Sequence, residues 1–163
     1  MNRRGFLRTA VAAGLLLAAP RLLTAGSERS EVMVEKIHKS DAEWRTLLTP
    51  EQYDVLRNEG TERAFTSELN KEYRKGVYHC AGCDYPLFSA DTKFDSGTGW
   101  PSFYAPIEGH VETKRDFKMI LPRTEYHCAR CGGHQGHVFN DGPEPTGQRW
   151  CNNGVALKFV PAG

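Results

Sequence analysis

Two capping patterns predict short helices near the start of the folded part of the chain. Ser40 and Glu43 form an S-x-x-E capping box, which predicts a helix through Leu48. The run T-P-E-Q at 49–52 places threonine at a second cap and proline in the first turn. A second helix is therefore expected, ended by Gly60.

After residue 76 the pattern changes to short β-type runs. Each run is bounded by glycine, proline or polar turn residues, and helical periodicity is absent. The sixteen glycines and nine prolines agree with many turns. We expect two short helices on an antiparallel β domain, with strands from VYHC (77–80), PLFS (86–89), FKMILP (117–122), TEYHC (124–128), HVF (137–139) and VALKFV (155–160).

The first 26 residues are typical of an export signal. Twin arginines at 3 and 4, followed by Phe6 and Leu7, precede an apolar run at 11–19. That run is shorter than the roughly 20 residues needed to cross a bilayer. The arginine pair indicates the twin-arginine (Tat) type, so we expect passage through the Tat translocase to the periplasm or another exported location. The alternative is an amphipathic first helix that stays on the protein.

The expected organisation is a signal at 1–26, a polar linker at 27–39 and one domain at 40–163. Removal of the signal leaves 17 of the 21 basic residues against 20 acidic ones, because four arginines lie in it. The net charge of the remaining chain is then −3. No basic stripe is left to bind phosphates, which argues against nucleic acid as a partner.

Four of the five cysteines form two C-x-x-C pairs. Two residues between cysteines let both sulfurs reach one metal, and two pairs complete a tetrahedral four-thiolate site that suits Zn²⁺. With every position filled by protein, one structural zinc per chain is expected. The alternative is two disulfides, as exported proteins often carry, although a bond within C-x-x-C is usually redox-active. The expected ligands are Cys80, Cys83, Cys128 and Cys131.

The fifth cysteine, Cys151, stands at the start of a run that resembles a strand. Arg149 lies two residues before it and Asn153 two residues after, so a strand would place all three on one side. A cation and an amide near a thiol favour the reactive thiolate. The alternative is a small buried hydrophobic residue.

Two further segments carry candidate chemistry. His134 and His137 follow the second cysteine pair, and a protonated imidazole can donate a proton near neutral pH. Their alternatives are zinc ligation, although four cysteines already complete that site, and an incidental surface loop. In FDSGTGWPSFY, Gly97 and Gly99 let the backbone bend tightly, and Trp100 begins an aromatic wall. Core packing is the alternative role for such aromatic residues.

Together these segments resemble the methionine-R-sulfoxide reductase B (SelR) family. The resemblance runs from about Trp44 to Phe159. It is carried by GTERAFTSEL, both C-x-x-C pairs, FDSGTGWPSF, GGHQGHVFNDGP and RWCNNGVALKF. It implies a β fold of two antiparallel sheets with zinc at its edge. It also implies reduction of methionine-R-sulfoxide in peptides or proteins to methionine, which would repair oxidised exported proteins.

The resemblance implies a role for each matching residue. The nucleophile falls on Cys151, whose thiolate would attack the sulfoxide sulfur and end as a sulfenic acid. The family's acid/base and substrate-orienting groups fall on His134, His137 and Asn153. Its substrate-binding positions fall on Arg149, beside the nucleophile, and on Trp100, whose ring would hold the substrate's methyl group.

One position departs from many family members, which carry a resolving cysteine in an S-G-C-G-W-P loop. This chain has Thr98 there, and its other four cysteines are expected to bind zinc. We therefore expect an external thiol, from a thioredoxin-like protein or a small molecule, to restore Cys151. Separately, we expect the protein to be a monomer.

Two rival functions remain to be distinguished. An exported zinc-binding interaction module without catalysis would explain the cysteine pairs but neither Cys151 nor the histidines. A cysteine hydrolase using Cys151 and His137 would need an oxyanion hole, which no segment suggests.

Overall fold

The structure is a computed structural model that describes residues 33–119 and 121–163. The expected signal at 1–26 and the first part of the expected linker, 27–32, lie outside the described residues, so both stay predictions. No helix among the described residues is long and apolar enough to cross a membrane.

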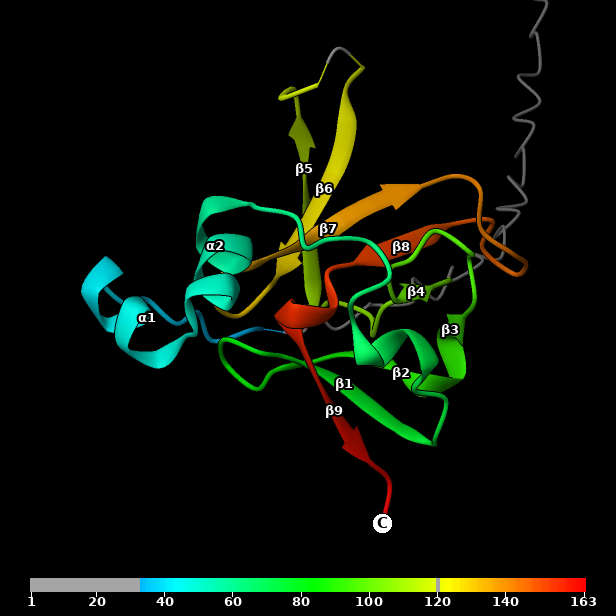
Figure 1. Ribbon diagram of the computed structural model, residues 1–163, viewed down its shortest axis with the longest axis horizontal. Helices are drawn as coiled ribbons and strands as arrows, with labels where there is room; N and C mark the ends of the chain where they lie inside the picture. Colours follow the sequence, from blue (N-terminus) through cyan, green and yellow to red (C-terminus); the bar gives the residue numbers. More distant parts are fainter. Residues whose placement is uncertain (1–32, 120) are drawn as a thin grey trace, which may run out of the picture. The chain divides into compact units, whose positions relative to one another are not determined.

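Two short helices, α1 (Asp41–Leu47) and α2 (Pro50–Asn58), begin at the expected caps (Figure 1). At each cap the side-chain oxygen of Ser40 or Thr49 accepts a backbone N–H three residues on. In return, the side chain of Glu43 accepts the backbone N–H of Ser40, and the side chain of Gln52 accepts that of Thr49. The predicted capping box at Ser40 is therefore confirmed, and the predicted cap at Thr49 forms a second capping box with Gln52.

The end of α2 differs from the prediction by one residue. Glu59, not Gly60, takes the left-handed conformation, with φ of +56°. The N–H of Gly60 donates to the carbonyl of Asp54 at 3.0 Å, which closes the last turn. Lys114 and Lys118 hold the Glu59 carboxylate in place, so its side chain is anchored despite this backbone.

The strands form two antiparallel sheets, as the family resemblance implied (Figure 1). The order is β2-β1-β9 in the three-stranded sheet and β3-β4-β8-β7-β6-β5 in the six-stranded sheet. The strands are β1 (Gly76–Cys80), β2 (Pro86–Ser89), β3 (Lys93–Phe94), β4 (Ser102–Phe103), β5 (Val111–Asp116), β6 (Arg123–Cys128), β7 (His134–Phe139), β8 (Arg149–Asn152) and β9 (Leu157–Pro161), with 3₁₀ helices η1 (Glu68–Lys71), η2 (Ala90–Thr92) and η3 (Gly154–Ala156).

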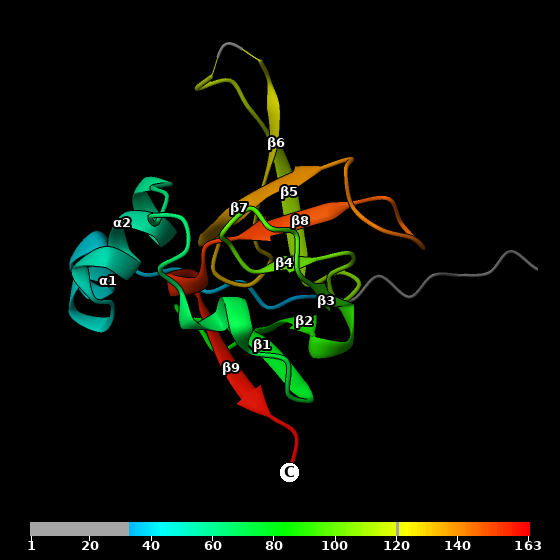
Figure 2. The ribbon, with the colours of Figure 1, turned by 45° about the vertical axis from the view of Figure 1, so that its right-hand side comes forward.

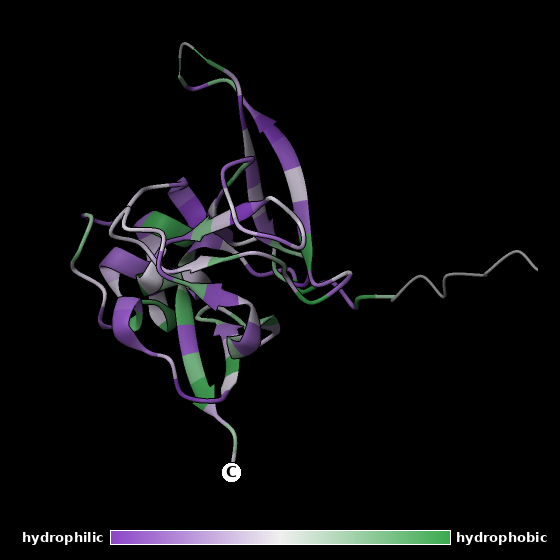
Figure 3. Ribbon diagram, turned by 90° about the vertical axis from the view of Figure 1, so that its right-hand side faces the viewer, coloured by the Kyte–Doolittle hydropathy of each residue, from purple (hydrophilic) through white to green (hydrophobic). Residues whose placement is uncertain are grey.

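The prediction of a strand over FKMILP is wrong, because the described residues of this run, 117–119 and 121–122, lie between β5 and β6 and belong to neither strand. Phe117, Met119 and Leu121 are 72%, 60% and 76% exposed there. The strand before it, β5 (VETKRD), escaped prediction because an edge strand with four exposed residues shows little apolar alternation. In Figures 1 and 2 this hairpin projects beyond the rest of its sheet, and Figure 3 shows it mostly hydrophilic.

The predicted strand VALKFV is shorter at its start than expected. Val155 and Ala156 belong to η3, and β9 begins only at Leu157. The Glu62 carboxylate accepts the N–H groups of Gly154 and Val155, at 2.6 and 2.8 Å, which holds this segment in a helical turn. Cys151 therefore lies inside a separate strand, β8.

A chain of aromatic rings joins the two sheets in the core. Phe88 on β2 stacks on Phe103 of β4 with ring centroids 4.2 Å apart. Tyr126 on β6 meets Phe88 edge-on at 6.0 Å, and Trp150 on β8 meets Tyr126 at 5.0 Å. This packing fixes the inner face of β8, so that the neighbours of Trp150 along the strand point toward the other face.

Candidate active site

Cys151 occupies the middle of the six-stranded sheet. It lies opposite Ser102 of β4 on one side and His137 of β7 on the other. Directly opposed residues of antiparallel strands have Cβ atoms about 4.5–5.5 Å apart, which brings the thiol next to the imidazole. Gly136 permits the close approach of β7, since a Cβ there would meet the Cys151 carbonyl oxygen at 1.9 Å.

A hollow of about 150 Å³ opens over Cys151. This is room for roughly one substrate side chain rather than a large ligand. Residues from the segment after α2, from the loop before β4, from β6, from β7, and from β8 and the residue after it surround the hollow: Thr61, Trp100, Arg123, Gly136, His137, Phe139, Cys151, Asn152 and Asn153. Of the site residues expected from the sequence, Cys151, His137, Trp100 and Asn153 thus meet here.

Trp100 reaches the hollow from the glycine-rich loop. Gly99 has φ of +92°, a conformation open to glycine, and this turn sets the direction of the following tryptophan. The Trp100 indole donates through Nε1 to the Glu62 carbonyl at 3.1 Å. The ring is therefore held by a hydrogen bond as well as by packing, and it keeps an apolar face for the hollow.

His137 is oriented by a carboxylate. Its Nε2 lies 2.7 Å from Asp116 Oδ2, and that oxygen also accepts from Arg123 Nη2 at 2.7 Å. The Lys118 N–H, assisted by His137 and Arg123, holds the pKa of Asp116 well below its ordinary value despite burial. Burial lowers the pKa of His137 below 6.5, Arg123 adds to this, and Asp116 opposes it. His137 is therefore mostly neutral at pH 7.

His134 stands behind His137 and does not line the hollow among the described residues. The two rings are 5.5 Å apart, edge to face. His134 is buried and its Nδ1 lies 2.6 Å from Glu125 Oε1. Glu125 is buried as well, which would raise its pKa, but hydrogen bonds from His127 and His134 outweigh this and lower the pKa to about 2. The ionised Glu125 fixes the orientation of His134.

The thiol itself is less acidic than the sequence suggested. Burial raises the pKa of Cys151 above 9.0, and this outweighs the opposing effects of the Arg149 charge and the Thr98 hydroxyl. Arg149 is buried and does not line the hollow among the described residues. Its guanidinium forms two hydrogen bonds with Asp141, at 2.9 and 3.0 Å, which neutralise part of its charge. The Cys151 thiolate is therefore a minor species at pH 7 in the free protein.

Asn153 is held at both ends of its amide. Its Oδ1 accepts the Glu62 N–H at 3.0 Å, and its Nδ2 donates to the Gln135 carbonyl at 2.9 Å. The second N–H of Nδ2 has no acceptor among the described residues, and Asn153 lines the hollow. Glu62 thus holds three parts of the site: its backbone bonds the Trp100 indole and the Asn153 amide, and its carboxylate bonds η3.

The other four cysteines converge at the turns β1–β2 and β6–β7. We call this cluster of four free thiols, which has no disulfide bond, the cysteine knot. Their sulfur atoms all lie within 4.8 Å of one another. The Cys80–Cys131 and Cys83–Cys128 sulfurs are 3.7 and 3.6 Å apart, close to the edge of about 3.8 Å of a tetrahedron with Zn–S bonds of about 2.3 Å. All five cysteines are free thiols. The four sulfurs are therefore placed to bind one metal ion, as expected.

One buried side chain connects the knot to the strand that bears Cys151. Gln135 donates from Nε2 to the Cys80 sulfur at 3.5 Å, and its Oε1 accepts from Asn152 Nδ2 at 3.3 Å. Asn152 is next to Cys151 in the chain and also accepts from the Tyr126 hydroxyl at 2.6 Å. The two cysteine regions share this hydrogen-bond network.

Sequence analysis missed four charged residues of the site: Glu62, Asp116, Arg123 and Glu125. Only Glu62 had a signal, because it falls within the GTERAFTSEL segment. The other three lie in β5 and β6, where they look like ordinary solvent-facing charges of a polar hairpin. Their role depends on the register that pairs Asp116 with Arg123 and Glu125 with His137.

Comparison with known proteins finds one family model, described as the SelR domain, that matches residues 48–161. The chain is also 54% identical over 133 residues to the peptide methionine sulfoxide reductase MsrB of Agrobacterium fabrum, covering 81% of this chain and 98% of that protein. The protein of the same name from Pseudomonas putida is 58% identical over 130 residues, covering 78% and 97%.

A plant protein is similar to the same degree. The chloroplastic peptide methionine sulfoxide reductase B1 of Arabidopsis thaliana is 58% identical over 121 residues, which cover 74% of this chain and 60% of that protein. The matched segment contains the hollow and the cysteine knot together. By its family model and by these relatives, the chain belongs to the SelR family.

Proposed function

We propose that the chain reduces methionine-R-sulfoxide in peptides and proteins with Cys151 as its nucleophile. Its family and relatives make it a peptide-methionine (R)-S-oxide reductase, which is an oxidoreductase. One observation supports the assignment of the nucleophile. Of the five cysteines, Cys151 lines the hollow beside Trp100 and His137, while the other four gather in the knot.

The hollow offers three different surfaces to a sulfoxide. The Trp100 ring receives the methyl group, because an apolar aromatic face binds the S-methyl end. His137 faces the oxygen, and Cys151 faces the sulfur. A chiral sulfur can satisfy all three surfaces in one epimer only, which accounts for selectivity toward the R form.

The chemical step converts one thiol and one sulfoxide into a sulfenic acid and a sulfide. The Cys151 thiolate attacks the sulfoxide sulfur while the protonated form of His137 donates a proton to the oxygen, whose negative charge grows as the new bond forms. The oxygen passes to Cys151 as –SOH, and methionine leaves as the sulfide. Asp116 orients His137 through Nε2 and leaves Nδ1 for the substrate. His134 supports the His137 ring from behind.

Recovery of the thiol requires an external reductant. A first thiol attacks the sulfenic acid, releases water and forms a mixed disulfide; a second thiol releases Cys151 as a thiol and leaves as the oxidised disulfide. Thr98 occupies the loop near Cys151, and the other cysteines are in the knot. Mass spectrometry during turnover should show no intramolecular disulfide of Cys151, and such a disulfide would overturn this part of the proposal.

The metal of the knot is proposed to be one Zn²⁺ per chain with a structural role. Four thiolates from two tight turns match the ligand set and geometry that zinc prefers. Bound zinc would cross-link the β1–β2 and β6–β7 turns and take no part in the reaction, since protein sulfurs fill all four positions.

Export through the Tat pathway is proposed from the twin arginines alone, with repair of oxidised exported proteins as its purpose. Arg3→Lys/Arg4→Lys should abolish export of a reporter that is active only when exported already folded. Unchanged export would contradict the proposal.

The test of the reductase function follows each epimer of methionine sulfoxide in a capped peptide with dithiothreitol as reductant. We expect loss of the R epimer only, and none with Cys151→Ser. A folded, metal-loaded protein that reduces neither epimer would overturn the function. Equal activity of Cys151→Ser and wild type would overturn the assignment of the nucleophile.

A further inference from the structure

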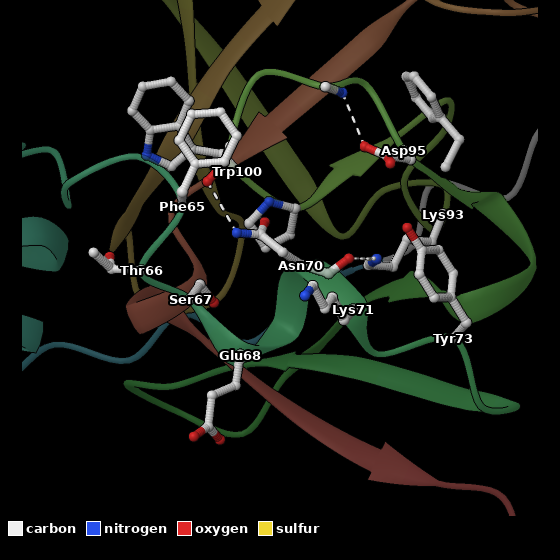
Figure 4. Close-up of a pocket in the computed structure, with 14 residues that line it drawn as sticks. Phe65, Thr66, Ser67, Glu68, Asn70, Lys71, Tyr73, Lys93, Asp95 and Trp100 are labelled. Carbon is white, nitrogen blue, oxygen red and sulfur yellow. Dashed lines mark hydrogen bonds between the residues drawn. The ribbon is translucent and has the colours of Figure 1, made fainter.

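A groove of about 620 Å³ adjoins the active-site hollow and shares Trp100 with it (Figure 4). It lies between η1 and the loop from β3 to β4. The active-site hollow has room for one side chain, whereas sites of roughly 300–1,000 Å³ hold ligands several times larger. A peptide whose oxidised methionine enters the hollow therefore meets this groove at Trp100.

At the Trp100 end of the groove stands an exposed aromatic residue, Phe65, in a strained backbone conformation. Its φ is +68°, which bulky residues rarely adopt, and its side chain is 74% exposed. Its N–H donates to the Gly99 carbonyl at 2.7 Å. The ring rests against Gly99, where a Cβ would meet it at 2.8 Å. The fold thus holds an apolar ring open to solvent beside Trp100, and such strain is typical of ligand sites.

At the other end of the groove, Lys93 makes a cation–π contact with Tyr73 (Figure 4). The Lys93 ammonium lies 3.9 Å from the Tyr73 ring centroid and donates to the Asn70 carbonyl at 2.9 Å. The Asp95 carboxylate accepts the Gly97 N–H at 2.9 Å. Two lysines and two acids line the groove, so its formal charges cancel. The groove therefore favours an apolar ligand at Phe65 over a charged one.

We propose that this groove binds the polypeptide flanking the oxidised methionine, with an apolar side chain of the substrate packed on Phe65. The proposal rests on the reductase function above and specifies its substrate class. It follows from the continuity of the two hollows at Trp100, from the exposed ring at their junction and from the balance of charge. Substrates with an apolar residue beside the oxidised methionine are then reduced faster than those with glycine there.

The test compares capped peptides that carry leucine or glycine immediately before or after methionine-R-sulfoxide, with dithiothreitol as reductant. For at least one position, kcat/KM should be roughly tenfold higher with leucine, the scale of one well-packed aromatic contact. Phe65→Asn removes the ring but accepts the left-handed backbone, and the preference for leucine should fall to about one. Phe65→Gly serves the same purpose if the asparagine variant melts early.

Leu47→Ala is the matched control, since Leu47 is an exposed apolar residue on α1 outside both hollows. It should keep the wild-type preference. Equal rates for leucine and glycine peptides at both positions in the wild-type protein would overturn the proposal, and so would an unchanged preference in Phe65→Asn. A capped single methionine-R-sulfoxide separates the two failures: if the wild-type protein does not reduce it, the reductase function itself has failed.

Discussion

The protein uses cysteine in two regions that differ in the number of thiols and in how the chain brings their neighbours together. The knot brings four thiols within 4.8 Å of one another at two turns, and it has no vacant ligand position once a metal is bound. The hollow holds one thiol in the middle of β8 with a hydroxyl, an imidazole and an indole around it. In the knot, short spacing in the chain sets the geometry. In the hollow, partners come from five separate segments, and burial makes the thiol weakly acidic.

The largest expected effect is loss of the knot. Cys128→Ser removes one of four ligands, and structural zinc sites contribute about 10–16 kcal/mol of gross binding free energy, which exceeds the stability of many domains. We expect the purified variant to lack zinc and cooperative thermal unfolding. The same substitution at Cys151 should leave zinc content at one per chain and the melting temperature nearly unchanged. Elemental analysis and calorimetry measure both, and a cooperative, metal-free Cys128→Ser protein would contradict a structural role of the metal.

A smaller effect is expected from the side chain that joins the regions. Gln135→Met keeps length and volume but cannot donate to Cys80 or accept from Asn152. Leaving such buried partners unsatisfied costs about 1–3 kcal/mol, which denaturant unfolding of the zinc-loaded protein would measure. Loss of a bond to a metal ligand also weakens metal affinity, by roughly 10–100-fold. Unchanged stability and unchanged zinc affinity would show that the two regions are independent.

The pH profile tests the electrostatics of the hollow. In the proposed mechanism, the rate follows the product of the Cys151 thiolate fraction and the protonated His137 fraction. Between the pKa of His137, below 6.5, and the pKa of Cys151, above 9.0, these fractions change in opposite directions and cancel. We therefore expect kcat/KM to fall below the first pKa, stay level between them and fall above the second.

Two substitutions should move the acidic limb of this profile in opposite directions. Asp116 raises the pKa of His137 and Arg123 lowers it. Asp116→Asn should therefore shift that limb to lower pH and reduce the plateau about tenfold, the equivalent of one pKa unit. Arg123→Gln should shift it to higher pH. Shifts of the same sign in both variants would mean that His137 is not the titrating acid.

The smallest expected effect is at Thr98, whose hydroxyl lowers the pKa of Cys151. Thr98→Val keeps the shape but removes the donor, so the basic limb should move up by roughly half to one pH unit, the scale of one hydrogen bond. Thr98→Ser is the matched control and should retain the wild-type limb. Ultraviolet absorbance of the thiolate, with Cys151→Ser as a blank, reports the same pKa directly. An identical limb in Thr98→Val and Thr98→Ser would exclude the contact.

Local signals in the chain were reliable where the interaction itself is local. Both helices begin at the predicted caps, Ser40 and Thr49, because cap and partner are three residues apart. The four knot cysteines were found from the C-x-x-C spacing for the same reason. The strand prediction for FKMILP was wrong because its apolar residues resemble a strand, whereas the charged neighbouring segment β5 is the strand that pairs with β6.

The sequence by itself therefore determined the helix starts, the β-rich class and the four cysteines that are placed to bind a metal. Through family resemblance it also indicated four residues of the hollow: Trp100, His137, Cys151 and Asn153. Only the tertiary structure decided which charged residues contact the site. Asp116, itself bound by Arg123, orients His137, and Glu125 orients His134. Arg149 forms an ion pair with Asp141. It also decided the sign of the Cys151 pKa shift. The physical reason is that pKa values depend on burial and on charges brought together by strand register, and neither is encoded in the spacing of neighbours along the chain.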